Sequence, residues 1–168
     1  MKRENLKTVY FMTHAAAIAA IYVVLTLVFA PIAFGPIQFR ISEALCILPF
    51  FTPAAVPGVF IGCFLSNLLC GAAPLDVVFG SLATLIGAIG SYMLRDKKWL
   101  VCVPPILSNT VIIPWVLRFA YGAEDMIPFM MLTVGIGEIV SCTLLGGILM
   151  TVLEKYRSQI FRTANIEG

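Results

Sequence analysis

Charged residues are scarce in this chain of 168 residues: they make up 12% of the sequence, whereas hydrophobic residues make up 60% and the mean hydropathy is +0.99. The net charge of +2 is too small to indicate a nucleic-acid partner. No stretch of linker-like or low-complexity composition separates off a soluble domain. The sequence therefore predicts an all-α integral membrane protein, with residues 1–168 forming a single transmembrane domain.

The sequence also lacks the usual patterns of metal binding and catalysis. Its one histidine, His14, and its five singly placed cysteines do not have the spacing of a zinc site or a disulfide framework. There is no G-x-x-x-x-G-K-[ST], no H-E-x-x-H and no G-x-S-x-G motif. We therefore expect no cofactor, no metal and no catalytic residue, and a transport process driven by ATP would need its ATPases from other chains.

Turn-forming residues divide the apolar sequence into six segments. A helix needs about 20 apolar residues to cross a bilayer, so six helices with their connections use the whole chain. We expect helices over residues 8–30, 40–51, 56–69, 75–94, 101–121 and 126–157. The predicted fold is a compact bundle of six transmembrane helices.

The basic residues predict the orientation of this bundle, because cytoplasmic loops carry an excess of lysine and arginine. Six spans place nine of the 11 basic residues on one side, whereas five spans would divide them between both sides. We therefore expect a multi-pass protein of the bacterial plasma membrane with both termini in the cytoplasm. The nine residues are Lys2, Arg3, Lys7, Arg95, Lys97, Lys98, Lys155, Arg157 and Arg162.

A few polar residues interrupt the apolar segments. An ionisable side chain at bilayer depth costs roughly 2.5 to 3.5 kcal/mol, so such residues mark functional sites. Carboxylates and amides together can hydrogen-bond the edge of a flat, purine-like ligand, and an aromatic face can cover it. The candidate binding residues on this argument are Arg40, Glu43, Asn67, Asp76, Asn109, Trp115 and Glu138.

Two features of these candidates remain open at the level of sequence. Arg40 and Glu43 are three residues apart on one helix and could neutralise each other as an internal ion pair. We place Glu43 and Asp76 near the outer surface, where they would contribute to an electronegative vestibule.

Pro114 predicts a kink that would free a backbone carbonyl beside Asn109.

Small residues recur every four positions on several segments, as at Gly58 and Gly62, which predicts close helix packing. On the first helix the same spacing produces two overlapping pairs, Ala15–Ala19 and Ala16–Ala20. These alanines leave a smooth groove, which serves either packing within the protein or the docking of a partner's helix.

Much of the chain, about residues 8–155, resembles the QueT family. The resemblance is most specific between Gly35 and Leu85, and it continues through Asn109 and Gly137-Glu138. It adds Gln38 to the candidate binding residues. The matching runs are Phe34-Gly-Pro-Ile-Gln38-Phe-Arg40-Ile-Ser-Glu43-Ala-Leu, Leu48-Pro49-Phe50, Pro57-Gly58-Val-Phe-Ile-Gly62-Cys63, Asn67, and Asp76-Val-Val-Phe-Gly80-Ser-Leu-Ala-Thr84-Leu85.

This family consists of S components, the substrate-binding subunits of energy-coupling factor (ECF) transporters that take up queuosine precursors. The resemblance implies a ligand of the 7-deazaguanine class: queuine or its aminomethyl or cyano precursor. It also implies three partner subunits, a transmembrane coupling protein and two ATPases. The double alanine pair looks like the family's docking motif for the coupling protein.

Other functions remain open. The chain could be an S component for another vitamin or heterocycle, or a channel or small carrier that works alone. A membrane-embedded enzyme using Glu138 as acid or base is a further alternative, although no motif supports it. Dependence on partner subunits separates these classes, because a channel or carrier moves solute by itself and an S component only binds it.

Overall fold

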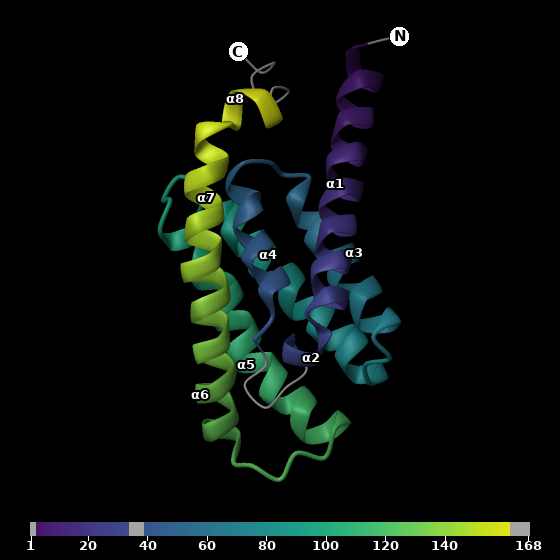
Figure 1. Ribbon diagram of the computed structural model, residues 1–168, viewed down its shortest axis with the longest axis vertical. Helices are drawn as coiled ribbons and strands as arrows, with labels where there is room; N and C mark the ends of the chain where they lie inside the picture. Colours follow the sequence, from purple (N-terminus) through teal and green to yellow (C-terminus); the bar gives the residue numbers. More distant parts are fainter. Residues whose placement is uncertain (1–2, 34–38, 162–168) are drawn as a thin grey trace.

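The computed structural model describes residues 3–33 and 39–161, and these residues form helices and the segments that join them (Figure 1). Three of the helices contain turns of more than one type and are divided into consecutive elements: η2 with α4, η3 with α5, and α6 with η4 and α7. The elements are α1 (Arg3–Val28), α2 (Ala30–Ala33), η1 (Ile41–Phe50), α3 (Ala55–Leu69), η2 (Asp76–Gly80), α4 (Ser81–Met93), η3 (Leu100–Cys102), α5 (Val103–Ala120), α6 (Ile127–Glu138), η4 (Ile139–Leu145), α7 (Gly146–Lys155) and α8 (Arg157–Ile160).

Four continuous helical stretches are long and apolar enough to cross a membrane: Asn5–Val28, Asp76–Met93, Leu100–Ala120 and Ile127–Lys155. Two shorter apolar helices, Ile41–Phe50 and Ala55–Leu69, fill the positions of the second and third predicted spans. The all-helical membrane fold is thus confirmed. The count of six spans and the cytoplasmic placement of the termini stay predictions.

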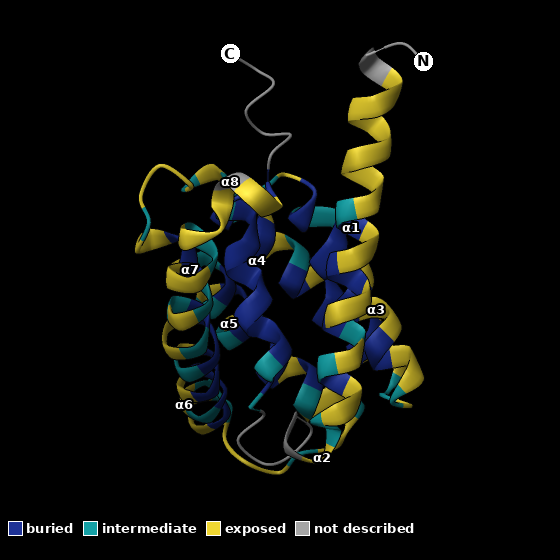
Figure 2. Ribbon diagram, turned by 45° about the horizontal axis from the view of Figure 1, so that its top comes forward, coloured by how far each residue is buried: buried dark blue, intermediate teal, exposed yellow. Residues whose placement is uncertain are grey.

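The surface of the bundle suits a bilayer rather than water. Exposed residues line the outward faces of several helices (Figure 2). The large apolar residues among them include Val24, Leu68, Leu107 and Leu132. A monomer in water rarely exposes contiguous apolar patches of this extent, whereas lipid solvates them.

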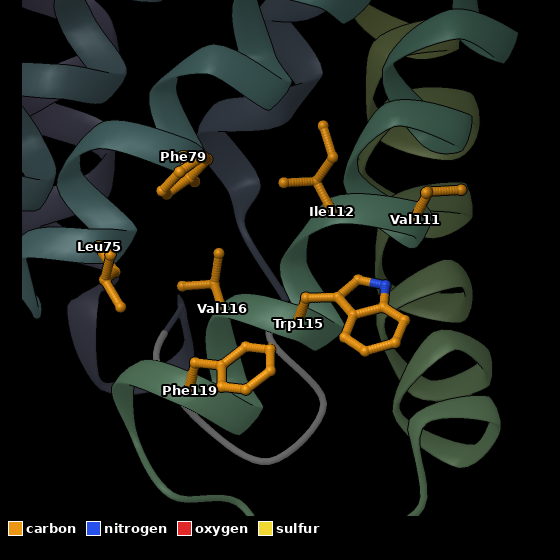
Figure 3. Close-up of a pocket in the computed structure, with 7 residues that line it drawn as sticks. All are labelled: Leu75, Phe79, Val111, Ile112, Trp115, Val116 and Phe119. Atoms are coloured by element: carbon orange, nitrogen blue, oxygen red, sulfur yellow. The ribbon is translucent and has the colours of Figure 1, made fainter.

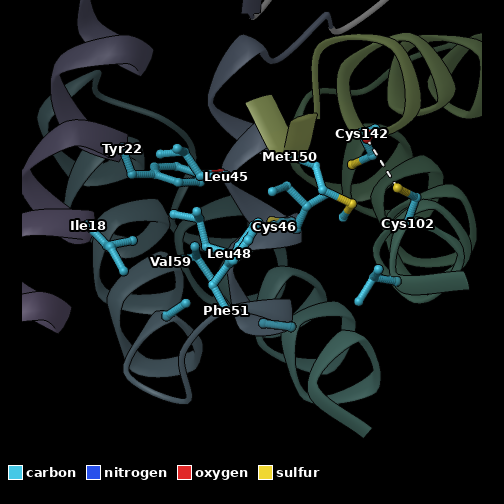
Figure 4. Packing of buried hydrophobic residues seen from close by; sticks show 14 of the residues in the cluster. Ile18, Tyr22, Leu45, Cys46, Leu48, Phe51, Val59, Cys102, Cys142 and Met150 are labelled. Atoms are coloured by element: carbon cyan, nitrogen blue, oxygen red, sulfur yellow. Dashed lines mark hydrogen bonds between the residues drawn. The ribbon is translucent and has the colours of Figure 1, made fainter. Parts of the chain in front are cut away.

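The short helix η1 lies at the centre of the bundle. It is a 3₁₀ helix of ten residues, and Ser42 through Pro49 are all buried. It contacts α1, α3, α4, α7 and η4 (Figures 1 and 4). Because a 3₁₀ helix rises about 2.0 Å per residue, η1 spans only about 20 Å and is shorter than the hydrocarbon layer.

A hydrophobic core surrounds η1. It joins Tyr22 of α1 and Val59 of α3 to Ile47 of η1 and Met150 of α7 (Figure 4). All five cysteines are free, and four of them are buried, as expected for cysteines that act as small apolar residues.

The predicted close packing at small residues is confirmed between α1 and α3. A Cβ added at Gly58 would lie 2.9 Å from the carbonyl oxygen of Ala15, and one added at Gly62 would lie 2.6 Å from Cβ of Tyr22. Helices α4 and α5 approach equally closely, because a Cβ at Gly87 would lie 2.6 Å from Cα of Pro105. Any larger residue at these positions would force the helices apart.

Candidate binding site

The bundle interior contains a set of polar residues that we name the polar cluster. Its six members come from the start of η1, from α3, from η2, from α5 and from the end of α6, and each is at most 4% exposed. Polar groups buried to this degree need hydrogen-bond partners, from the protein or from a ligand. The members are Arg40, Glu43, Asn67, Asp76, Asn109 and Glu138.

Glu43 is fully engaged by protein donors. Its Oε1 accepts hydrogen bonds from the Tyr22 hydroxyl (2.5 Å) and the Thr84 hydroxyl (3.2 Å), and its Oε2 accepts one from the Cys46 thiol (2.8 Å). These bonds join η1 to α1 and α4. The carboxylate that was expected near an outer vestibule is therefore fully buried, and its hydrogen bonds connect helices of the bundle.

Arg40 forms an ion pair with Asp76, not the internal pair with Glu43 that its position on the helix allows. Nη2 of Arg40 lies 3.5 Å from Oδ2 of Asp76, and both side chains are buried. The Tyr121 hydroxyl donates to the same Oδ2 at 2.9 Å and accepts from the backbone N–H of Ala73 at 3.2 Å. Partial burial raises the pKa of the Tyr121 phenol above its ordinary value, so it remains a donor at neutral pH.

The second oxygen of Asp76 has no such partner. Oδ1 is buried and makes no hydrogen bond among the described residues. Gly80 leaves the space that this oxygen occupies, because a Cβ added there would lie 2.6 Å from it. Asn67 helps to hold this part of the chain, since its Nδ2 donates to the backbone carbonyl of Asp76 at 3.4 Å.

The side of the polar cluster formed by α5 and η4 has the most unused hydrogen-bonding capacity. Both amide atoms of Asn109, Oγ1 of Thr110 and Oγ of Ser141 are buried without a hydrogen-bond partner among the described residues. The Glu138 carboxylate lies near enough to the Asn109 amide to interact with it, and it accepts a 3.5 Å bond from the Cys142 thiol. Since an unsatisfied buried polar atom costs roughly 1 to 3 kcal/mol, a further polar group that bonded to these atoms would be stabilised.

The helical hydrogen-bonding pattern changes to a π pattern at two carboxylates of the polar cluster, Asp76 and Glu138. Asp76 is the first residue of the π segment η2, and Glu138 immediately precedes the π segment η4. Single π turns within α-helices are frequent at functional sites, because they leave backbone groups and side chains off the regular α register. The sequence has no pattern that signals these turns.

Of the described candidate residues, Trp115 is not brought together with the others. Trp115 is 48% exposed and lies on the outer face of α5, where its ring stacks against Phe119. There it borders an apolar hollow of about 430 Å³ that Leu75 and Phe79 also line (Figure 3). Trp115 therefore cannot cover a ligand that is bound at Asn109 in this arrangement. Gln38 lies outside the described residues.

The four alanines of α1 separate into two faces. Ala15 and Ala19 are buried against α3, where they contribute to the packing at Gly58 and Gly62. Ala16 and Ala20 are exposed. The pair Ala15 and Ala19 therefore packs within the protein, whereas the pair Ala16 and Ala20 is left exposed, where a partner's helix could contact it.

Several residues of the polar region could not be found from the sequence. Tyr22 and Thr84 bind Glu43, and Tyr121 binds Asp76. Thr84 stands four residues after Gly80, but this spacing of small residues predicts close helix packing and not a contact with Glu43. Ser141 stands four residues after Gly137, and this spacing likewise indicates packing.

A membrane-embedded helical protein whose interior holds a polar cluster with unsatisfied groups has the features of proteins that bind or move small polar solutes through the bilayer. The particular family follows from sequence comparison. The profile of the QueT transporter family matches residues 12–155, and the chain belongs to this family.

A curated relative agrees with this assignment. Over 90 residues the chain is 42% identical to the queuosine precursor transporter QueT of Lactococcus lactis subsp. cremoris (strain MG1363). The match covers 52% of this chain and 53% of the relative, so it spans about half the length of each protein. No solved structure matches the chain.

Proposed function

We propose that this protein is the substrate-binding subunit of an ECF-type importer and that it captures a 7-deazaguanine queuosine precursor from outside the cell. The observation that supports this most directly is that Asn109, Thr110 and Ser141 carry buried, unsatisfied polar atoms, and that Asn109 lies near the Glu138 carboxylate. Family membership gives the class of ligand, since the curated relative is a queuosine precursor transporter.

The chemistry of these residues suits the ligand. A guanine-type edge presents adjacent N–H donors, and one carboxylate can accept two of them, as Glu138 would. The amide of Asn109 can donate to a ring acceptor and accept from a ring N–H. Such a site rejects ligands that leave its buried groups unpaired, which is how polar sites obtain specificity.

An importer that concentrates its substrate needs an energy source. The sequence contains no nucleotide-binding motif, so the proposed assembly includes a coupling membrane protein and two ATPase subunits. The exposed alanines Ala16 and Ala20 are the proposed contact with the coupling protein, because small residues let a partner's helix approach closely.

The test combines binding with transport. Native mass spectrometry of the purified protein with queuine, its aminomethyl precursor and its cyano precursor should show one retained ligand, while adenine serves as the control purine. The protein alone in liposomes should bind that ligand without accumulating it. Uptake by the protein alone would contradict the assignment to ECF transport, and retention of an unrelated vitamin in place of all three deazaguanines would contradict the substrate.

A further inference from the structure

A groove with a basic rim lies at the end of the bundle where α1 begins and α8 ends. We define it by Lys7 of α1, Arg95 after α4 and Arg157 of α8, which surround a hollow of about 390 Å³. Four segments far apart in the sequence meet here: α1, the end of η1, the end of α4, and α8. The end of η1 contributes Phe50 and the adjacent Phe51 to the lining. The polar cluster shares no residue with this groove.

Two of the three cations of the groove, Arg95 and Arg157, rest on aromatic rings. The guanidinium of Arg157 lies 5.8 Å from the ring centre of Phe50, and that of Arg95 lies 4.3 Å from the ring centre of Tyr92. A guanidinium held in this way is positioned at small entropic cost and binds phosphate oxygens through its N–H groups.

These cations are not neutralised within the described part of the chain. The ion pairs formed there are Arg40–Asp76 and Lys98–Glu154, neither of which involves the groove. The described lining contains no carboxylate. Three positive charges that face one hollow with aromatic walls therefore favour an anionic, amphipathic occupant.

We propose that the groove binds the phosphate headgroup of an anionic phospholipid, with the acyl chains running along the neighbouring apolar surface. The rim supplies charge for the phosphate, and exposed Tyr10 and Phe11 of α1 supply a path to the lipid-facing side. Basic pockets between transmembrane helices bind anionic headgroups in this way. A basic protein partner would be repelled by the same rim.

The experiment compares two double variants that lose the same charge. Arg95→Gln/Arg157→Gln removes cations from the groove, whereas Lys97→Gln/Lys155→Gln removes neighbouring cations that do not line it. The full-length protein is titrated with phosphatidylglycerol and, separately, with phosphatidylcholine of identical acyl chains, and bound lipid is counted by native mass spectrometry. Thermal melting checks that each variant is folded.

We expect the wild-type protein to retain phosphatidylglycerol in preference to phosphatidylcholine. Each cation near an anionic lipid is worth about a fivefold change, so the groove variant should bind about 20- to 30-fold more weakly and the control variant less than about threefold. If a double variant fails to fold, Lys7→Gln alone should still weaken binding about fivefold.

Three outcomes would overturn the proposal. Equal losses in both double variants would mean that the basic end attracts lipid without a site. Equal retention of phosphatidylcholine would remove the role of charge. Unchanged lipid binding together with lost assembly on the coupling protein would assign the groove to that protein.

Discussion

At the scale of single residues, two glutamates of the polar cluster differ in how many hydrogen bonds the protein gives them. Glu43 accepts three hydrogen bonds from Tyr22, Thr84 and Cys46, so its acceptor capacity is used within the protein. Glu138 accepts one long bond from a thiol and lies among atoms without partners. The first carboxylate therefore links η1 to α1 and α4, and the second keeps more capacity to accept hydrogen bonds.

Glu138→Gln and Asn109→Ala should weaken ligand binding with little effect on the stability of the ligand-free protein. Glu138→Gln replaces an acceptor with a donor and leaves a buried mismatch of roughly 1 to 3 kcal/mol, which is about 5- to 150-fold in affinity. Isothermal titration calorimetry with the retained deazaguanine measures the change. Unchanged affinity in both variants would exclude these residues from the site.

Glu43→Gln should have the opposite profile. The new amide would face three donors with one donor group of its own, so we expect the free energy of unfolding to fall by roughly 1 to 3 kcal/mol. Melting curves without ligand measure this loss, and calorimetry on the folded fraction should show nearly normal affinity. A stable Glu43→Gln protein that no longer binds ligand would instead place Glu43 in the binding site.

Gly80→Ala tests whether the carboxylate of Asp76 takes part in the site. The added Cβ would lie 2.6 Å from Oδ1, so the carboxylate must shift, and this shift would disturb the contacts of Oδ2 with Arg40 and Tyr121. We expect about a tenfold loss of affinity, equivalent to 1.4 kcal/mol. The matched control is Gly147→Ala, whose Cβ meets nothing within 4 Å. Equal losses of affinity in Gly80→Ala and Gly147→Ala would mean that replacing a helical glycine weakens binding by itself, without a role for the Asp76 carboxylate.

At the scale of helices, the sequence predicted most elements well. The first, third and fifth expected helices overlap α1, α3 and α5 closely, because apolar periodicity and turn residues mark their limits. The changes of winding at η1, η2 and η4 were not predictable, since 3₁₀, α and π turns use the same residue types and differ only in which carbonyl each N–H selects. The polar cluster was predicted residue by residue, but its partners, such as Arg40 with Asp76, depend on how the helices pack.

The two faces of α1 lead to a prediction about assembly. Ala16→Trp and Ala20→Trp add bulk on the exposed face, so we expect normal melting and normal ligand binding but loss of association with the coupling protein in a pull-down. Ala15→Trp and Ala19→Trp add bulk between α1 and α3 and should lower the melting temperature, since overpacking costs roughly 1 to 3 kcal/mol. Association that survives both exposed-face variants would exclude this groove as the docking surface.

At the scale of the whole molecule, the distribution of charge gives a test of topology. The segment after α4 and the end of α7 lie at the same end of the bundle, and the connection between α5 and α6 lies at the other (Figure 1). In a Cys70→Ser background, Lys97→Cys and Lys155→Cys should react with an impermeant maleimide only in inverted vesicles, and Glu124→Cys only in intact cells. Labelling of Lys97→Cys and Lys155→Cys from different sides would contradict the six-span topology.

The π segments η2 and η4 also determine how this chain can be compared with others. A π turn closes its hydrogen bond one residue later than an α turn does, so each segment accommodates one residue more than a regular helix of the same height. A relative that lacks such a turn would be one residue shorter at that point. An alignment without a gap at such a point would pair residues that differ by about 100° around the helix axis. At η4, such an alignment could match Glu138, which precedes the π segment, and would still shift every residue of α7, which follows it.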